Sequence, residues 1–228
     1  MTHPALSGIT PALTTGGDRS RYPQIDPKGS THTKDWINAL ISEGLGFHTD
    51  IGAFSTPITG GGNGTVVDID QPEGIVSVAD GTTLMLISAQ VECHVPLLAT
   101  DADEAEIILA ADIASAYADD GTVTAETPVS LRGGGVSGSQ SNATVASAAT
   151  ADITDPVLGL EMDAARITGD VQGTPATALW TPLMLNYEPK YPFQLQGPTA
   201  IYLYWGGTVA VTGFAKLSWI ELPESYFS

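Results

Sequence analysis

Basic residues and cysteines are scarce in this chain of 228 residues. Eight lysines and arginines stand against 26 aspartates and glutamates, which gives a net charge of −18 at pH 7. Such a charge repels nucleic acid phosphates and anionic lipid surfaces, and it favours solubility. Cys93 is the single cysteine, so no disulfide can form within the chain. We therefore expect a soluble protein whose fold depends on its apolar core.

Long apolar runs and targeting signals are absent as well. No apolar stretch approaches the length of about 18 residues that a membrane-spanning helix needs. The stretch 1–17 lacks the basic start and the apolar segment of a secretory signal peptide. Synthesis in the cytoplasm is therefore the expectation.

The few basic residues gather near the N-terminus. Residues 1–34 hold half of them, namely Arg19, Arg21, Lys28 and Lys34. Only two acids accompany them, so this segment has a net charge of +2 and the rest of the chain has −20. Residues 1–30 are rich in Thr, Gly, Pro and Ser and show no period. We predict an extended N-terminal arm over 1–33, with Arg19 and Arg21 as candidate contacts to other subunits.

One short helix is expected after the arm. Apolar residues recur there at helical spacing, namely Trp36, Ile37, Leu40 and Ile41. Thr33 is a suitable N-cap, and Gly44 is placed to end the helix. We predict a helix over 34–43, within a linking segment 34–46, and Trp36 is a further candidate contact.

From about residue 47, apolar and polar residues alternate, as in half-buried strands. The clearest alternation covers 83–95, 122–132 and 208–219, and weaker candidates are 48–55, 64–70, 74–79, 105–117, 143–153, 178–187 and 199–205. Asp80-Gly81 and Asp120-Gly121 are hairpin signals between such runs. The pattern predicts an all-β domain over 47–228, a two-sheet antiparallel sandwich of the single jelly-roll type.

Residues capable of catalysis or metal binding form no recognisable site. Every second residue from Met85 to Val95 is apolar, which places Cys93 in the core as an inert thiol. One acidic cluster offers hard oxygen ligands for Ca²⁺, namely Asp101, Asp103, Glu104 and Glu106. It lacks the glycine and the spacing of a calcium loop, which favours a solvated acidic loop. We expect no cofactor and no enzymatic activity.

The stretch 201–205 is rich in large side chains. Its alternation assigns Ile201, Leu203 and Trp205 to the core, and it assigns Tyr202 and Tyr204 to the opposite face. A sugar-binding platform is one interpretation of the tyrosines. A contact between subunits is favoured, because Tyr is enriched at protein interfaces. We therefore predict that Tyr202 and Tyr204 lie at an interface.

Several segments resemble viral capsid proteins. They are Ile75–Thr83, Tyr191–Phe193, Gly197-Pro198, Ile201–Tyr204, Thr212–Phe214 and Trp219–Pro223. Over residues 65–222 the chain is similar to jelly-roll capsid proteins of small icosahedral, tail-less phages and environmental viruses. The resemblance implies a structural virion protein, made in the host cytoplasm, that assembles into a shell through jelly-roll edges and its arm. Its partners would be copies of itself, with room for other capsid proteins, and no catalytic residues are implied.

The arm departs from shell proteins that wrap a genome directly, since those often carry many more basic residues. At +2 it neutralises few phosphates, so we expect little direct nucleic acid binding. Genome contact would then fall to an internal membrane that the arm touches, to another protein or to pressurised packaging. Two alternatives stay open. One is a trimeric jelly-roll spike or receptor-binding module of the tumour-necrosis-factor or C1q kind, and the other is a carbohydrate-binding or cupin-like sandwich.

Overall fold

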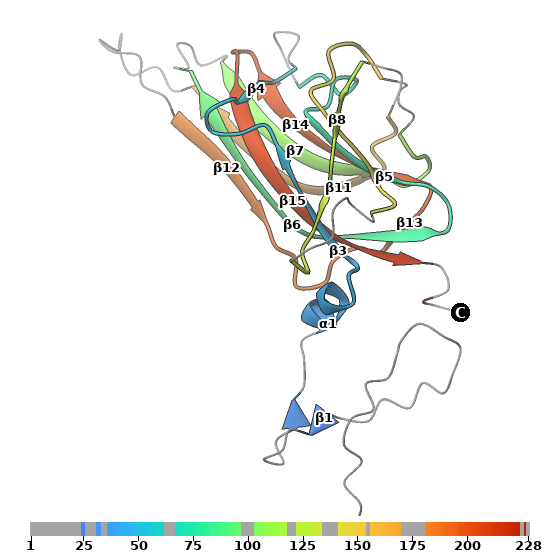
Figure 1. Cartoon of the computed structure of the whole chain (residues 1–228). Coiled ribbons are helices and arrows are strands. Elements are labelled where there is room, and N and C mark those ends of the chain that lie inside the picture. The colour runs from blue at the N-terminus through green and yellow to red at the C-terminus, as the bar shows by residue number, and fades with distance from the viewer. Residues whose placement is uncertain are drawn as a thin grey trace, which may run out of the picture. The chain divides into compact units, whose positions relative to one another are not determined.

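The computed structural model describes residues 24–25, 31–32, 36–61, 67–96, 103–117, 122–133, 141–153, 156–169, 181–223 and 226 (Figure 1). The chain divides into two units, Met1–Ala39 and Leu40–Ser228, with the boundary inside the predicted helix. The first unit contains a small antiparallel pair, β1 (Gln24–Ile25) with β2 (Thr31–His32). The rest of the predicted arm 1–33, with Arg19 and Arg21, lies outside the described residues.

Helix α1 (Trp36–Ser42) confirms the predicted short helix. The Gly44 N–H donates to the Ile41 carbonyl at 2.9 Å, and Gly44 has a φ of 88°. This left-handed conformation favours glycine and ends the helix, as the sequence predicts. The predicted cap, Thr33, lies outside the described residues. Trp36 is 45% exposed, whereas Leu40 is buried.

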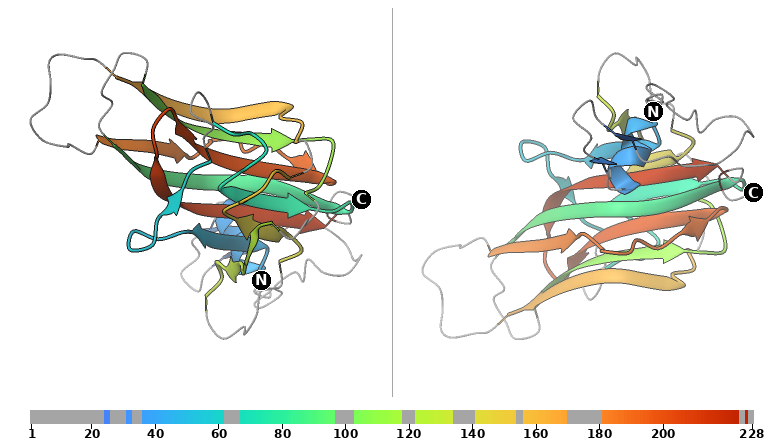
Figure 2. Two further views of the ribbon diagram at one scale, coloured as in Figure 1. Left: turned by 90° about the horizontal axis from the view of Figure 1, so that it is seen from above. Right: turned by 90° about the horizontal axis from the view of Figure 1, so that it is seen from below.

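Two antiparallel sheets enclose the main core (Figure 2). The larger sheet runs β12 (Thr181–Tyr187), β6 (Thr82–Val95), β15 (Thr212–Pro223), β3 (Gly46–Ile51) and β9 (Val129–Ser130), with β13 (Leu195–Gln196) on β6 and β4 (Ile58–Thr59) on β15. The smaller sheet runs β11 (Leu160–Thr168), β7 (Glu104–Asp112), β14 (Thr199–Gly207), β5 (Gly74–Val78), β10 (Thr144–Ser147) and β8 (Thr124–Glu126). The predicted all-β, two-sheet antiparallel sandwich is therefore confirmed.

The eight longest strands of the described part pair in a nested order. In the larger sheet β3 pairs with β15 and β6 pairs with β12. In the smaller sheet β5 pairs with β14 and β7 pairs with β11. Among these eight, the first strand therefore pairs with the last, the second with the seventh, and so on inward. The pairs also alternate between the two sheets along the chain.

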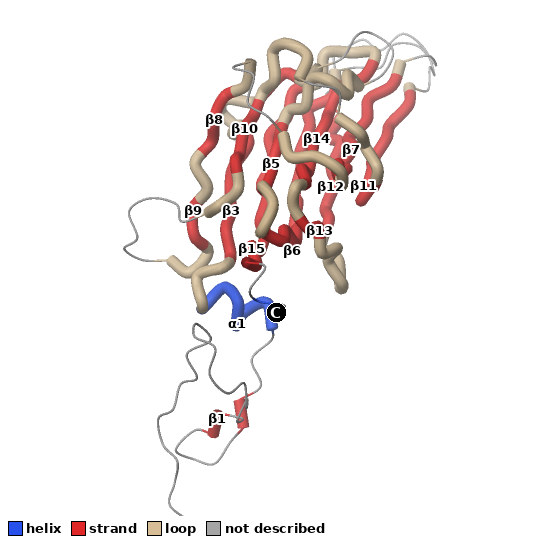
Figure 3. Tube along the Cα trace, turned by 90° about the vertical axis from the view of Figure 1, so that its right-hand side faces the viewer, coloured by secondary structure: helices blue, strands red, loops and turns tan. Residues whose placement is uncertain are grey.

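The segment between β7 and β11 adds strands to one edge of each sheet (Figure 3). Strand β10 extends the smaller sheet beside β5, and β9 extends the larger sheet beside β3. Strands β11 and β12 form the opposite edges of the two sheets. At one end of the sandwich both sheets are thus extended by short strands of this segment, and at the other end β11 and β12 are the edge strands.

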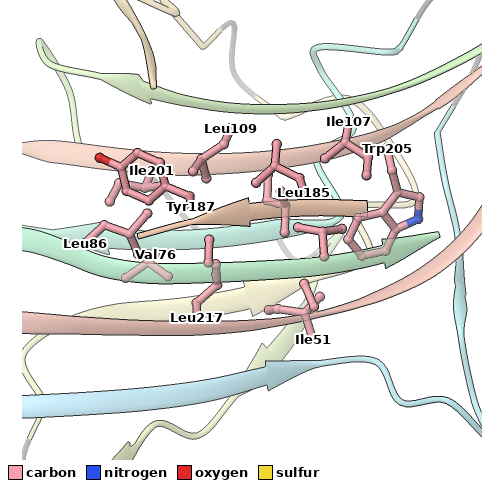
Figure 4. Close-up of a cluster of buried hydrophobic side chains, with 14 of the residues drawn as sticks. Ile51, Val76, Leu86, Ile107, Leu109, Leu185, Tyr187, Ile201, Trp205 and Leu217 are labelled. Atoms are coloured by element: carbon pink, nitrogen blue, oxygen red, sulfur yellow. The ribbon is translucent and has the colours of Figure 1, made fainter. Parts of the chain in front are cut away.

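The main core lies between the sheets and is built from alternate strand positions (Figure 4). Ile201, Leu203 and Trp205 of β14 are all buried in it, as their alternation predicts. Cys93 is also buried in this core, and burial raises the pKa of its thiol, which keeps the thiol protonated at neutral pH. The prediction of an inert core thiol is consistent with this position.

The core assignment of Met85 and Ile87 is wrong. The pairing of β6 with β15 shifts between Ser218 and Trp219, so one extra residue of β6 stands at a bulge. Because side chains alternate across a strand, one extra residue reverses the faces on either side of it. Met85 and Ile87 therefore leave the main core and pack with Leu40 of α1 on the other face of the larger sheet.

Strand β11 is missing from the predicted strands. Its sequence, LEMDAARIT, contains strong helix formers, and it too has a bulge, between Glu161 and Asp163. Leu160 packs against the main core before the bulge, Met162 packs against it at the bulge itself, and Ala165 and Ile167 do so afterwards. The bulge thus breaks the period of two. Elsewhere, the predicted strand 122–132 splits into β8 and β9. Of the predicted strand 64–70, the described residues 67–70 end in a turn and belong to none of the strands.

Candidate interaction surface

Tyr202 and Tyr204 do not form an exposed face, so their assignment to an interface is wrong. Their exposed fractions are 2% and 0%, and they lie in a second apolar cluster. Their neighbours there are Val67, Ile75, Tyr117, Ala146, Ile153 and Ala200. The Tyr204 hydroxyl donates to the Ile69 carbonyl at 2.9 Å, and burial raises the pKa of Tyr202 to about 12. A sugar platform on these two rings is excluded by the same burial.

The second apolar cluster exists because the segment between β7 and β11 folds over the smaller sheet. Tyr117 and Ile153 belong to this segment and pack over the outward side of β14, while Ala146 lies on the same face of the sheet, on β10. The alternation of 201–205 correctly separates the two faces of the strand. It carries no information about which distant segment covers the second face.

Glu73 is a buried carboxyl group that holds the segment at Gly60 and Gly61 against the end of β14. It accepts hydrogen bonds from the Gly61 N–H at 2.5 Å and from the Trp205 N–H at 2.8 Å. A Cβ atom at Gly60 would lie 2.0 Å from the Trp205 carbonyl oxygen, so the close approach requires glycine there. Burial raises the pKa of Glu73 to about 8, and Asp68 adds to the rise, against the smaller opposing effect of hydrogen bonds from the N–H groups of Gly61, Trp205 and Glu73 itself.

Asp112 and Glu221 are two further buried carboxyl groups that position loops. Burial alone would raise the pKa of Asp112, but hydrogen bonds from Ala114, Ser115 and Val157 outweigh it and lower the pKa. Glu221 accepts from the Asn142 N–H at 2.6 Å, the Ala143 N–H at 3.3 Å and the Trp219 Nε1 at 2.8 Å. Each of these three carboxyl groups thus holds chain segments together, a role that the sequence pattern did not reveal.

The acidic cluster proposed for Ca²⁺ has other contacts. Glu104 forms an ion pair with Arg166 of β11, and Glu106 accepts from the Val67 N–H at 3.4 Å. Asp101 lies outside the described residues. Within the described part of the chain, no group of three or more His, Cys, Asp or Glu side chains is placed to hold a metal ion. The geometry supports structural contacts for Glu104 and Glu106.

The outward face of the larger sheet carries polar, charged and apolar side chains. We call it the outer face; its residues alternate with core residues on β3, β15, β6 and β12, and they include His48, Asp50, Gln90, Glu92, His94, Met184, Phe214, Lys216 and Ser218. Near α1 this side of the sheet is covered by the helix, through Leu40 and Ile41. Away from the helix it carries two large apolar side chains, of which Met184 is exposed and Phe214 is half-buried.

Three rings gather at the end of the outer face away from α1. The ring centroids of Phe54 and Phe214 are 6.2 Å apart. The His94 ring centroid lies 5.8 Å from that of Phe54 and 6.5 Å from that of Phe214, and all three pairs meet edge to face. Phe54 is 72% exposed, and Met184 of β12 is 53% exposed. Exposed aromatic side chains and Met are enriched where proteins bind one another. This aromatic end of the outer face is the best candidate interaction surface of the described chain.

Tyr202 and Tyr204, the predicted contact residues that belong to this unit, do not lie on this surface. Tyr202 and Tyr204 lie inside the subunit, Trp36 belongs to the other unit, and Arg19 and Arg21 are not among the described residues. Among the described residues no helix is long and apolar enough to cross a membrane. A comparison of the chain with models of known protein families, with curated proteins and with solved structures finds no match.

Proposed function

We propose that this chain is a structural subunit of a viral capsid, a jelly-roll protein that assembles with copies of itself and catalyses no reaction. The nested pairing of the eight long strands carries the proposal. A jelly roll is a long antiparallel ribbon that is wound into two sheets, and the alternation of β3–β15, β5–β14, β6–β12 and β7–β11 between the sheets supports that winding. The resemblance of residues 65–222 to jelly-roll capsid proteins points the same way.

The layering of the subunit also supports a structural role. Besides the main core, the smaller sheet is backed by the second apolar cluster and the larger sheet by the helix end. The buried carboxyl groups Glu73, Asp112 and Glu221 are used to fix loops. A subunit with several packed layers is rigid, and a shell requires subunits that keep their conformation at contacts with their neighbours.

A trimeric spike or receptor-binding module is the second candidate function. The aromatic end favours it, because the exposed Phe54 ring, packed on the half-buried His94 and Phe214, suits recognition of another molecule. The two functions differ in the size of the assembly, since a spike stays a trimer and a shell contains many more copies.

Electron microscopy and light scattering of the purified full chain test the proposal. We expect closed particles, and we expect that deletion of residues 1–30 abolishes them but leaves a folded subunit, because both sheets belong to the unit Leu40–Ser228. The melting temperature of the truncated chain should stay within a few degrees of that of the parent. A full chain that stays trimeric at high concentration would refute the shell and favour the spike.

Nucleic acid binding by the isolated protein should be undetectable at physiological salt. The net charge of −20 outside residues 1–34 outweighs the +2 within them, and non-specific binding requires basic contacts with phosphates. Fluorescence anisotropy with a labelled random oligonucleotide measures this. Binding at micromolar protein concentration would contradict the expectation and assign the arm a direct role in genome contact.

A further inference from the structure

The two edge strands β11 and β12 differ in how they are protected against pairing with other chains. Edge strands present unpaired N–H and C=O groups, and proteins usually protect them with charges or bulges. Strand β11 has both, since it carries Glu161, Asp163 and Arg166 and has a bulge at 161–163. Strand β12, with the sequence TPLMLNY, has no charged residue, and its register with β6 is continuous over all seven residues.

Within the described structure, no strand pairs with the edge of β12 that faces away from β6. Strand β12 ends the strand order of the larger sheet, so among the described strands only β6 and no second strand pairs with it. Pro182, Met184 and Asn186 are exposed, whereas Leu183 and Leu185 are buried. Each exposed position of β12 is therefore uncharged, in a chain whose net charge is −18.

The sequence of β12 is complementary to itself when two copies run antiparallel. Met184 is the middle residue of Thr181–Tyr187. A two-fold axis beside it would place Met184 opposite its counterpart and Pro182 opposite Asn186 of the other copy. No like charges meet in this register, and Leu183 faces Leu185 on the core side. Pro182 lacks an N–H and removes at most one hydrogen bond per copy near the strand end.

We propose that β12 is a site of self-association, where two copies of this chain pair antiparallel about Met184 and join their larger sheets. The inference deepens the proposed self-assembly and rests on it. A second copy fits better than an unrelated strand, because an uncharged border lets two strongly acidic chains approach, and one sequence supplies both sides of the contact. The exposed Met184 side chain, beside Glu92 of β6, becomes covered in the pair.

A cysteine at position 184 tests the pairing directly. Residues opposite each other in an antiparallel pair have Cβ atoms about 4.5–5.5 Å apart, close to the reach of a disulfide. The native Cys93 is buried and does not compete. We expect Met184→Cys in the full chain to form covalent dimers under mild oxidation at least ten times faster than Ala164→Cys, the matched control at an exposed position of β11.

A charge at the same position should weaken the contact. Met184→Lys places two ammonium groups opposite each other across the axis, so we expect at least a tenfold rise in the protein concentration needed for association. Ala164→Lys should leave that concentration unchanged, and both variants should keep the melting temperature of the parent, because both positions are exposed.

The outcomes separate this inference from the proposed function. Assembly of the parent with no faster cross-linking at 184 than at 164 overturns the β12 contact and leaves the capsid proposal standing. Dimers linked through 184 that never enlarge into particles support the contact and overturn the capsid proposal. A full chain that stays monomeric at high concentration overturns both.

Discussion

Replacing Tyr202 and Tyr204 together by serine is expected to unfold the subunit, not merely to weaken contacts between copies. Both rings are fully buried with their centroids 6.2 Å apart, and they are packed by segments that arrive from distant parts of the chain. Removing a large buried aromatic side chain costs about 3–5 kcal/mol. Two such losses approach the whole free energy of unfolding of an ordinary domain, about 5–15 kcal/mol. Urea unfolding followed by circular dichroism measures the loss.

Two single variants serve as controls for this result. Tyr204→Phe removes only the hydrogen bond to the Ile69 carbonyl and should cost about 1 kcal/mol. Tyr191→Ser changes an exposed tyrosine and should alter the free energy of unfolding by less than about 0.5 kcal/mol. A double variant that keeps the parent's unfolding midpoint while losing assembly would show that the tyrosines act between subunits after all.

The stability of the subunit should fall as the pH rises from about 5 to 9, and Glu73 should account for much of the fall. The pKa of Glu73 is about 8 in the folded chain, against an ordinary value of 4.5. Between these values the folded state binds one more proton than the unfolded state, so raising the pH favours unfolding. The stabilisation is complete below pH 4.5 and is lost through pH 8. The full difference corresponds to about 4–5 kcal/mol.

Glu73→Gln removes this titration and should flatten the pH profile. At pH 5 the variant should be less stable than the parent by about 1–3 kcal/mol. Its NH2 group would face one of the two N–H groups, whereas in the parent a carboxyl oxygen accepts a hydrogen bond from that N–H. At pH 9 the order should reverse, so the two curves of unfolding free energy against pH cross. Glu188→Gln, at an exposed position, should reproduce the parent's slope. Parallel curves for Glu73→Gln and the parent would disprove the role of Glu73.

The sequence alone determined the local features of this protein. Alternation located most of the long strands, because a strand with one buried face must repeat every second residue. It also placed Cys93 and Trp205 in the main core, and Gly44 at the end of the helix, since a left-handed residue there favours glycine. These features depend on residues that are close together in the chain.

The tertiary structure decided everything that depends on distant partners. Alternation distinguishes the two faces of 201–205, but only the segment between β7 and β11 determines that the face with Tyr202 is buried. Bulges in β6 and β11 arise from pairing with β15 and β7, and each reverses which residues face the core. The link that Glu73 makes between Gly61 and Trp205 likewise forms only when β14 is in place. A single sequence does not state which segments meet, because contact across the fold is set by packing and not by the order of neighbouring residues.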